Sequence, residues 1–131
     1  MSPAKYRPRD IARRTGLSTH RLAMQVDRGI LRLSEDDIEA NGTGTCRRYT
    51  AATVRKAALL HALMQAGLQP KAAGRVDEQI HRATVTPGDL IVADRNGVAE
   101  ITSSYRPSTN AAVVLDVGTL FAELDRSLAA A

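Results

Sequence analysis

Residues 18–28 carry side chains whose chemistry suits nucleobase edges and phosphate oxygens. Arginine can bond both acceptors of guanine, glutamine can bond adenine, and the short hydroxyls can bond either bases or phosphates. The side chains of these types are Ser18, Thr19, His20, Arg21, Gln25 and Arg28. Arg21 and Gln25 lie four residues apart and would share one face of a helix. We therefore expect this face to contact double-stranded DNA, with Arg21 and Gln25 at the bases.

A second candidate contact cluster, formed by two arginines and a tyrosine, follows the Gly-rich turn signal at residues 41–44: Arg47, Arg48 and Tyr49. Residues 30–33 alternate between apolar and polar types, so they are predicted to form a strand that pairs with residues 45–49. The pair would form a hairpin, or wing, whose arginines grip phosphates or enter the minor groove. Tyr49 would pack the wing on the next helix, contact phosphate, or do both.

Two short helices must position these side chains. Residues 9–15 are predicted as the first helix, and residues 19–28 as the second, which Ser18 caps and Gly29 ends. Gly16 stops the first helix and supplies the backbone freedom of a sharp turn. Small and apolar residues at the crossing provide a shared core: Ala12, Ile11, Leu17 and Leu22. This pattern predicts a helix-turn-helix whose second helix enters the major groove.

The remaining chain divides at Pro87-Gly88. Before it, helices are predicted at residues 51–66, with Thr50 as cap, and 70–82. After it, strands are predicted at 90–93, 98–102 and 112–115, and a helix at 118–130. The predicted fold class is α+β, mainly α in the N-terminal half, a winged helix-turn-helix followed by a small strand-rich segment with a C-terminal helix. The predicted domains are 6–82, which binds DNA, and 87–131, for dimerisation or partner binding.

Charge is distributed unevenly along the chain. Residues 1–75 hold 14 Lys and Arg against 6 Asp and Glu, a net charge of +8, whereas residues 76–131 hold 4 against 8, a net charge of −4. A domain that binds a polyanion, joined to a separate partner-binding segment, would show this division. A scattered, solvated surface would show it as well.

No pattern indicates an enzyme, a cofactor or a metal site. No serine lies in a nucleophile-elbow pattern, and the glycines at 42 and 44 lack the context of a phosphate-binding loop. Asp36-Asp37 is interpreted as a solvated wing tip. The candidate metal ligands, which are Cys46, His20, His61 and His81, show no ligand spacing. Apolar runs are too short to span a bilayer, and we expect a cytoplasmic, nucleoid-associated protein.

Several of these segments resemble the MerR-type winged-helix domain over about residues 6–76. They are residues 10–18 (Asp-Ile-Ala-Arg-Arg-Thr-Gly-Leu-Ser), Leu22, 29–31 (Gly-Ile-Leu), 47–50 (Arg-Arg-Tyr-Thr) and 65–68 (Gln-Ala-Gly-Leu). MerR-like proteins are usually dimeric bacterial regulators that bind palindromic promoter DNA, and smaller relatives include phage excisionases. The resemblance implies a sequence-specific transcriptional regulator.

The chain departs from the family pattern at two places. Ala23, Met24 and Gln25 stand where the family usually has arginine followed by aromatics. The break at Pro87-Gly88 stands where regulators usually continue into a long coiled-coil helix. We therefore expect a homodimer that pairs through residues 87–131 instead.

Two alternative functions remain. One is an excisionase-like architectural factor that bends DNA and contacts a recombinase. The other is a protein-interaction adaptor or antitoxin, including one that contacts RNA polymerase, and the altered residues after Leu22 motivate it.

Overall fold

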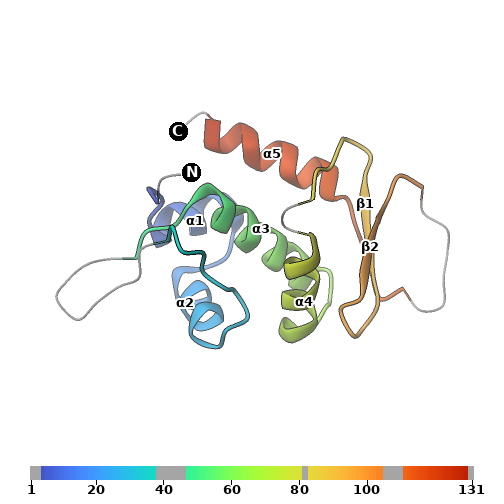
Figure 1. The fold of residues 1–131 in the computed structure, drawn as a ribbon, viewed down its shortest axis with the longest axis horizontal. Helices are drawn as coiled ribbons and strands as arrows, with labels where there is room; N and C mark the ends of the chain where they lie inside the picture. The colour runs from blue at the N-terminus through green and yellow to red at the C-terminus, as the bar shows by residue number, and fades with distance from the viewer. Residues whose placement is uncertain (1–3, 38–46, 81–82, 105–110, 130–131) are drawn as a thin grey trace. The chain divides into compact units, whose positions relative to one another are not determined.

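A computed structural model of the chain describes residues 4–37, 47–80, 83–104 and 111–129 (Figure 1). The elements in chain order are α1 (Pro8–Thr15), α2 (Thr19–Asp27), α3 (Ala51–Gln65), α4 (Pro70–Ile80), β1 (Leu90–Ala93), β2 (Ala99–Thr102), β3 (Val113–Leu115) and α5 (Val117–Ala129). The α+β class is confirmed, with helices in the N-terminal half, a small antiparallel sheet and a C-terminal helix. None of the helices in the described ranges is long and apolar enough to cross a membrane.

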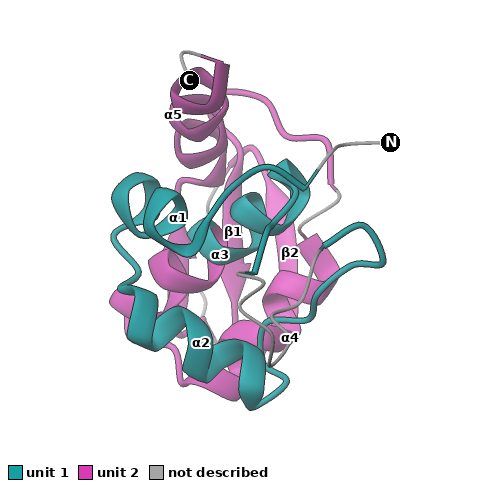
Figure 2. Ribbon diagram, turned by 90° about the vertical axis from the view of Figure 1, so that its left-hand side faces the viewer, with its two compact units in different colours: residues 1–58 teal, residues 59–131 magenta. Residues whose placement is uncertain are grey.

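The chain forms two compact units, residues 1–58 and 59–131, and the boundary between them falls within α3 (Figure 2). The predicted division into 6–82 and 87–131 therefore differs from the units, and it remains a prediction about function. Each unit has its own apolar core. In the first unit, the fully buried side chains include Ile11, Leu17 and Leu22. Each such side chain contributes roughly 1.5–3 kcal/mol by leaving water.

Local capping chemistry sets the corner between α1 and α2. The backbone N–H of Arg7 donates to the Asp10 carboxylate at 2.9 Å, which closes the start of α1. Gly16 ends α1 with φ of 81°, and its N–H donates to the Ala12 carbonyl at 2.9 Å. Ser18 then caps α2 by accepting a hydrogen bond of 3.2 Å from the Arg21 N–H. The predicted turn and caps are therefore confirmed.

The strand predicted at residues 30–33 is wrong. The backbone N–H groups of Ile30 and Leu31 both donate to the Gln25 carbonyl at 3.0 Å, so they close the end of α2 and are not available to a sheet. Tyr49 pairs with Tyr6 in an isolated antiparallel bridge, with N···O distances of 2.8 and 3.0 Å. The turn predicted at residues 41–44 lies outside the described residues, and a wing there stays a prediction.

Asp37 has a structural role that the sequence interpretation did not assign to it. Its carboxylate accepts hydrogen bonds from the backbone N–H of Ser34 at 2.8 Å, from the backbone N–H of Thr50 at 2.7 Å and from the Thr53 hydroxyl. Thr50 also caps α3 as predicted, because its hydroxyl accepts from the Thr53 N–H at 3.3 Å. Asp37 is therefore an anchor for the start of α3 and not a solvated wing tip.

In the second unit, three antiparallel strands lie in the order β2-β1-β3. Ile91 of the central strand pairs with Ile101 on one side and Leu115 on the other. Gln79 of α4 clamps the β1–β2 connection, because its amide donates to the Gly97 carbonyl at 2.6 Å and accepts from the Ala99 N–H at 3.3 Å. The predicted strands are therefore present, with β2 and β3 each starting one residue later than expected.

The C-terminal helix α5 begins at Val117, one residue before the predicted start. Asp116 caps it, because one carboxylate oxygen accepts from the Thr119 N–H at 3.0 Å and the other from the Thr119 hydroxyl at 2.9 Å. Phe121 and Leu124, three residues apart on one side of the helix, are buried.

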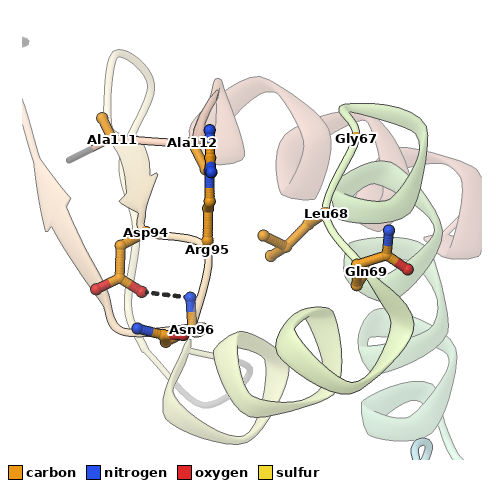
Figure 3. Close-up of a pocket in the computed structure, with 8 residues that line it drawn as sticks. All are labelled: Gly67, Leu68, Gln69, Asp94, Arg95, Asn96, Ala111 and Ala112. Atoms are coloured by element: carbon orange, nitrogen blue, oxygen red, sulfur yellow. Dashed lines mark hydrogen bonds between the residues drawn. The ribbon is translucent and has the colours of Figure 1, made fainter. Parts of the chain in front are cut away.

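An open hollow of about 900 Å³ lies within the second unit. Residues 67–69, 94–96 and 111–112 line it (Figure 3). Asp94 is engaged in its own turn, since its carboxylate accepts from the N–H groups of Asn96 and Val98, both at 2.9 Å. The Asp94 carboxylate therefore stabilises the β1–β2 turn.

Candidate nucleic-acid interface

The first turn of α2 presents four of the predicted contact residues to solvent. Ser18, Thr19, His20 and Arg21 are all exposed, and Arg28 is exposed just after the end of the helix. The opposite side of α2 is anchored by Leu22, which is buried in the core of the first unit. The helix is therefore fixed by its apolar face while its N-terminal polar residues remain accessible.

Gln25 does not occupy the exposed face predicted for it. Its side chain is 4% exposed, because residues three apart share one side of a helix and Gln25 lies on the same side as buried Leu22. Among the described residues, its Oε1 atom has no hydrogen-bond partner. The expected outward placement is wrong, and the geometry gives no support for base contact by Gln25.

Arg47 is held by an ion pair to the end of α2. Its Nη2 atom lies 3.0 Å from Oδ1 of Asp27, with side-chain exposures of 24% for Arg47 and 66% for Asp27. The hydrogen bond that the guanidinium donates to Asp27 raises the pKa of Arg47 above its ordinary value, against the lowering effect of burial. Arg47 therefore stays charged, with its guanidinium partly open to solvent.

Arg48 and Tyr49 differ in their accessibility. Arg48 is half-buried, whereas Tyr49 is 1% exposed. Burial raises the pKa of the Tyr49 hydroxyl, and the nearby Arg47 lowers it in part. Tyr49 is therefore buried within the first unit, and its packing on the next helix and its contact with phosphate both stay predictions.

A further group of cations surrounds Tyr6 at the start of the chain. The Lys5 Nζ atom lies 5.3 Å from the centroid of the Tyr6 ring, and the Arg14 guanidinium carbon lies 5.7 Å from it. Arg9 and Arg13, exposed on α1, add to the positive field. Lys5 is not among the predicted contacts, because only the bridge between Tyr6 and Tyr49 brings residues 5–6 beside residue 49.

Net charge distinguishes the two units. Residues 1–58 hold 12 Lys and Arg against 6 Asp and Glu, a net charge of +6, and residues 59–131 hold 6 against 8, a net charge of −2. One of the cations in the first unit is internal: Lys56 is buried and its ammonium donates to the Arg32 carbonyl at 2.8 Å. The unit that contains α2 is therefore the one suited to a polyanion.

Within the ranges that the structure describes, no three His, Cys, Asp or Glu side chains gather as metal ligands would. His20 is exposed on α2 and His61 lies on α3. Cys46 and His81 lie outside the described residues.

Residues 6–80 match the family model of the MerR HTH family regulatory proteins. The chain belongs to this family. No curated protein matches it. The match runs from Tyr6 to Ile80, the last residue of α4, so the MerR domain contains α1–α4, and the sheet and α5 lie beyond it. Membership makes the chain a DNA-binding transcription regulator, and regulators of the MerR family are normally not enzymes.

Proposed function

We propose that this MerR-family regulator binds double-stranded DNA sequence-specifically as a homodimer, with α2 in the major groove. The observation that carries the proposal is the exposed first turn of α2, which the Ser18 cap and the turn at Gly16 hold in place. Helix-turn-helix proteins read base edges with the N-terminal residues of their second helix. Thr19, His20 and Arg21 occupy those positions here.

The segment at residues 47–48 would supply phosphate contacts. Arg47 and Arg48 come just before α3 and are both partly exposed. Contacts of this kind fix the register of a protein on the duplex without reading sequence. Arg28, exposed beyond the end of α2, would add a further contact to the backbone.

Pairing through residues 87–131 would provide the second half-site. Strands β2 and β3 are the outer strands of the sheet, and Val114 of β3 is 41% exposed. A short outer strand with an exposed apolar residue suits pairing with an identical strand about a two-fold axis. Such a dimer would bind a palindromic or repeated site, with half-sites about one helical turn of DNA apart or a multiple of it.

The test begins by selecting binding sites for the full chain from a pool of random duplexes. Affinity for the selected site is then measured by fluorescence anisotropy between about 50 and 200 mM salt. The logarithm of the association constant should fall linearly with the logarithm of the salt concentration, with a slope of about −0.9 per phosphate contact. Replacement of an arginine in the first unit should weaken binding, whereas Arg126→Ala on α5 removes the same charge beyond the MerR domain and should leave affinity unchanged. Failure to bind any duplex would refute the proposal.

The dimer is tested separately, by analytical ultracentrifugation of the full chain. We expect a two-fold mass at micromolar concentration and a selected site with inverted or repeated halves. Val114→Lys at the exposed edge should convert the dimer to monomer. A monomer in the unaltered protein would contradict the dimer without touching the assignment of DNA binding.

A further inference from the structure

Asp27 is a negative charge at a place where helix electrostatics disfavour one. It is the last residue of α2, where the helix dipole presents its negative end. It is also 66% exposed, on the helix proposed to face DNA phosphates. A surface ion pair adds little stability by itself. Stability therefore gives little account of the pair with Arg47.

Arg47 is restrained at both ends of its side chain. Close to its backbone, Tyr49 exchanges hydrogen bonds with Tyr6 at 2.8 and 3.0 Å, and the Tyr49 ring is buried. At its tip, the guanidinium donates to Asp27 at 3.0 Å. A guanidinium has five N–H donors, so one bond to Asp27 leaves others directed away from the carboxylate.

We infer that Asp27 is a positioning residue, which holds the Arg47 guanidinium in the orientation that a DNA phosphate needs. This inference rests on the proposed contact between Arg47 and DNA. The hydrogen bond that Arg47 donates to Asp27 limits the rotamers of the long arginine side chain before DNA arrives, so less conformational freedom is lost on binding.

A positioning role and simple Coulomb repulsion predict opposite changes in DNA affinity when Asp27 is replaced. Removing a negative charge near DNA should strengthen binding if Asp27 acts only through its charge. If Asp27 positions Arg47, the full chain with Asp27→Ala should bind its selected DNA site roughly three- to tenfold more weakly. Asp27→Asn keeps an acceptor without the charge, so its affinity should lie between those of the wild type and Asp27→Ala.

Asp36→Ala is the matched control, because it removes the same charge from an exposed position in the same unit. It should leave affinity unchanged or raise it slightly. Thermal unfolding of each variant checks that the protein tested is folded. An Asp27→Ala protein that binds as tightly as the Asp36→Ala protein, or more tightly, overturns the inference.

A double-mutant cycle separates this inference from the function on which it rests. Arg47→Ala should weaken binding and reduce the salt slope by about 0.9, the value for one phosphate contact. Asp27→Ala should cause no further weakening in the Arg47→Ala background, because its positioning effect acts through Arg47; loss of the Asp27 charge should leave affinity unchanged or raise it slightly. If Arg47→Ala has no effect on affinity, the proposed phosphate contact fails and the inference fails with it. If Arg47→Ala weakens binding and Asp27→Ala does not, only the positioning role is refuted.

Discussion

The carboxylate of Asp37 accepts a hydrogen bond of 2.7 Å from the backbone amide of Thr50, thirteen residues further along the chain. The same carboxylate accepts from Ser34 and from the Thr53 hydroxyl. One side chain therefore joins the two ends of the segment that precedes α3. Arg47 and Arg48 lie in this segment just before Thr50, so the bond to Asp37 helps to fix the backbone that carries them.

We expect Asp37→Ala to lower the free energy of unfolding by about 2–3 kcal/mol, because it removes several hydrogen bonds to a charged acceptor and leaves the buried Thr50 and Thr53 donors unsatisfied. Urea denaturation measures the change. Asp36→Ala, at the exposed neighbouring position, should change stability by less than about 0.5 kcal/mol. Equal losses in the two variants would contradict the anchoring role of Asp37.

Substitutions at Gly97 and Gly88 distinguish the cost of a strained backbone from the cost of a steric clash. Both have positive φ, 83° and 95°, but a Cβ at Gly97 would lie 2.5 Å from the Ala72 carbonyl oxygen, whereas nothing lies within 4 Å of one at Gly88. Gly88→Ala should cost about 1 kcal/mol from the backbone conformation alone. Gly97→Ala should cost roughly 1–3 kcal/mol more, because α4 must move away from the turn. Denaturation curves that coincide for the two variants would show that this close approach does not matter.

Burial of Tyr49 predicts a loss of stability at alkaline pH. Its pKa is raised in the folded protein above the ordinary 10.0, so the folded state binds the phenolic proton more tightly than the unfolded chain. The stability linked to this group is complete below about pH 10 and is lost as pH rises through the folded pKa. Thermal unfolding between about pH 8 and pH 11 should show a smaller decline in stability for Tyr49→Phe than for the wild type, because phenylalanine has no phenolic proton to lose. Parallel declines would contradict the prediction.

Arg21 and Arg48 should affect DNA binding in different ways. Arg21→Ala removes a side chain from the exposed first turn of α2 and should relax base preference at one position of the selected site, by about 1–3 kcal/mol. Arg48→Ala should weaken binding to all duplexes equally and reduce the salt slope by about 1. Competition with single-base variants of the site measures both effects. If Arg21→Ala weakened binding to all duplexes equally, Arg21 would contact phosphate and not a base.

The local chemistry of the chain was enough to predict the helix-turn-helix. Gly16 must end a helix because its backbone can adopt positive φ, and Ser18 must begin one because its hydroxyl caps a free N–H. These effects act within four residues, so a sequence displays them directly. The strands around residues 90–102 could be predicted for the same reason, since alternation and a tight turn are local patterns.

Tertiary structure decided which polar side chains are available to DNA. Gln25 carries the right chemistry, and the sequence already predicted Leu22 in the core, but only the packing shows that the core side of α2 extends from Leu22 to Gln25. Residues 30–31 have a strand-like pattern, yet their N–H groups are used by the Gln25 carbonyl. Asp37, Lys5 and Asp27 gain their partners from residues 13 to 44 positions away. A sequence specifies such pairs only through the whole fold, because the energy of each contact depends on a backbone path that no short segment determines by itself.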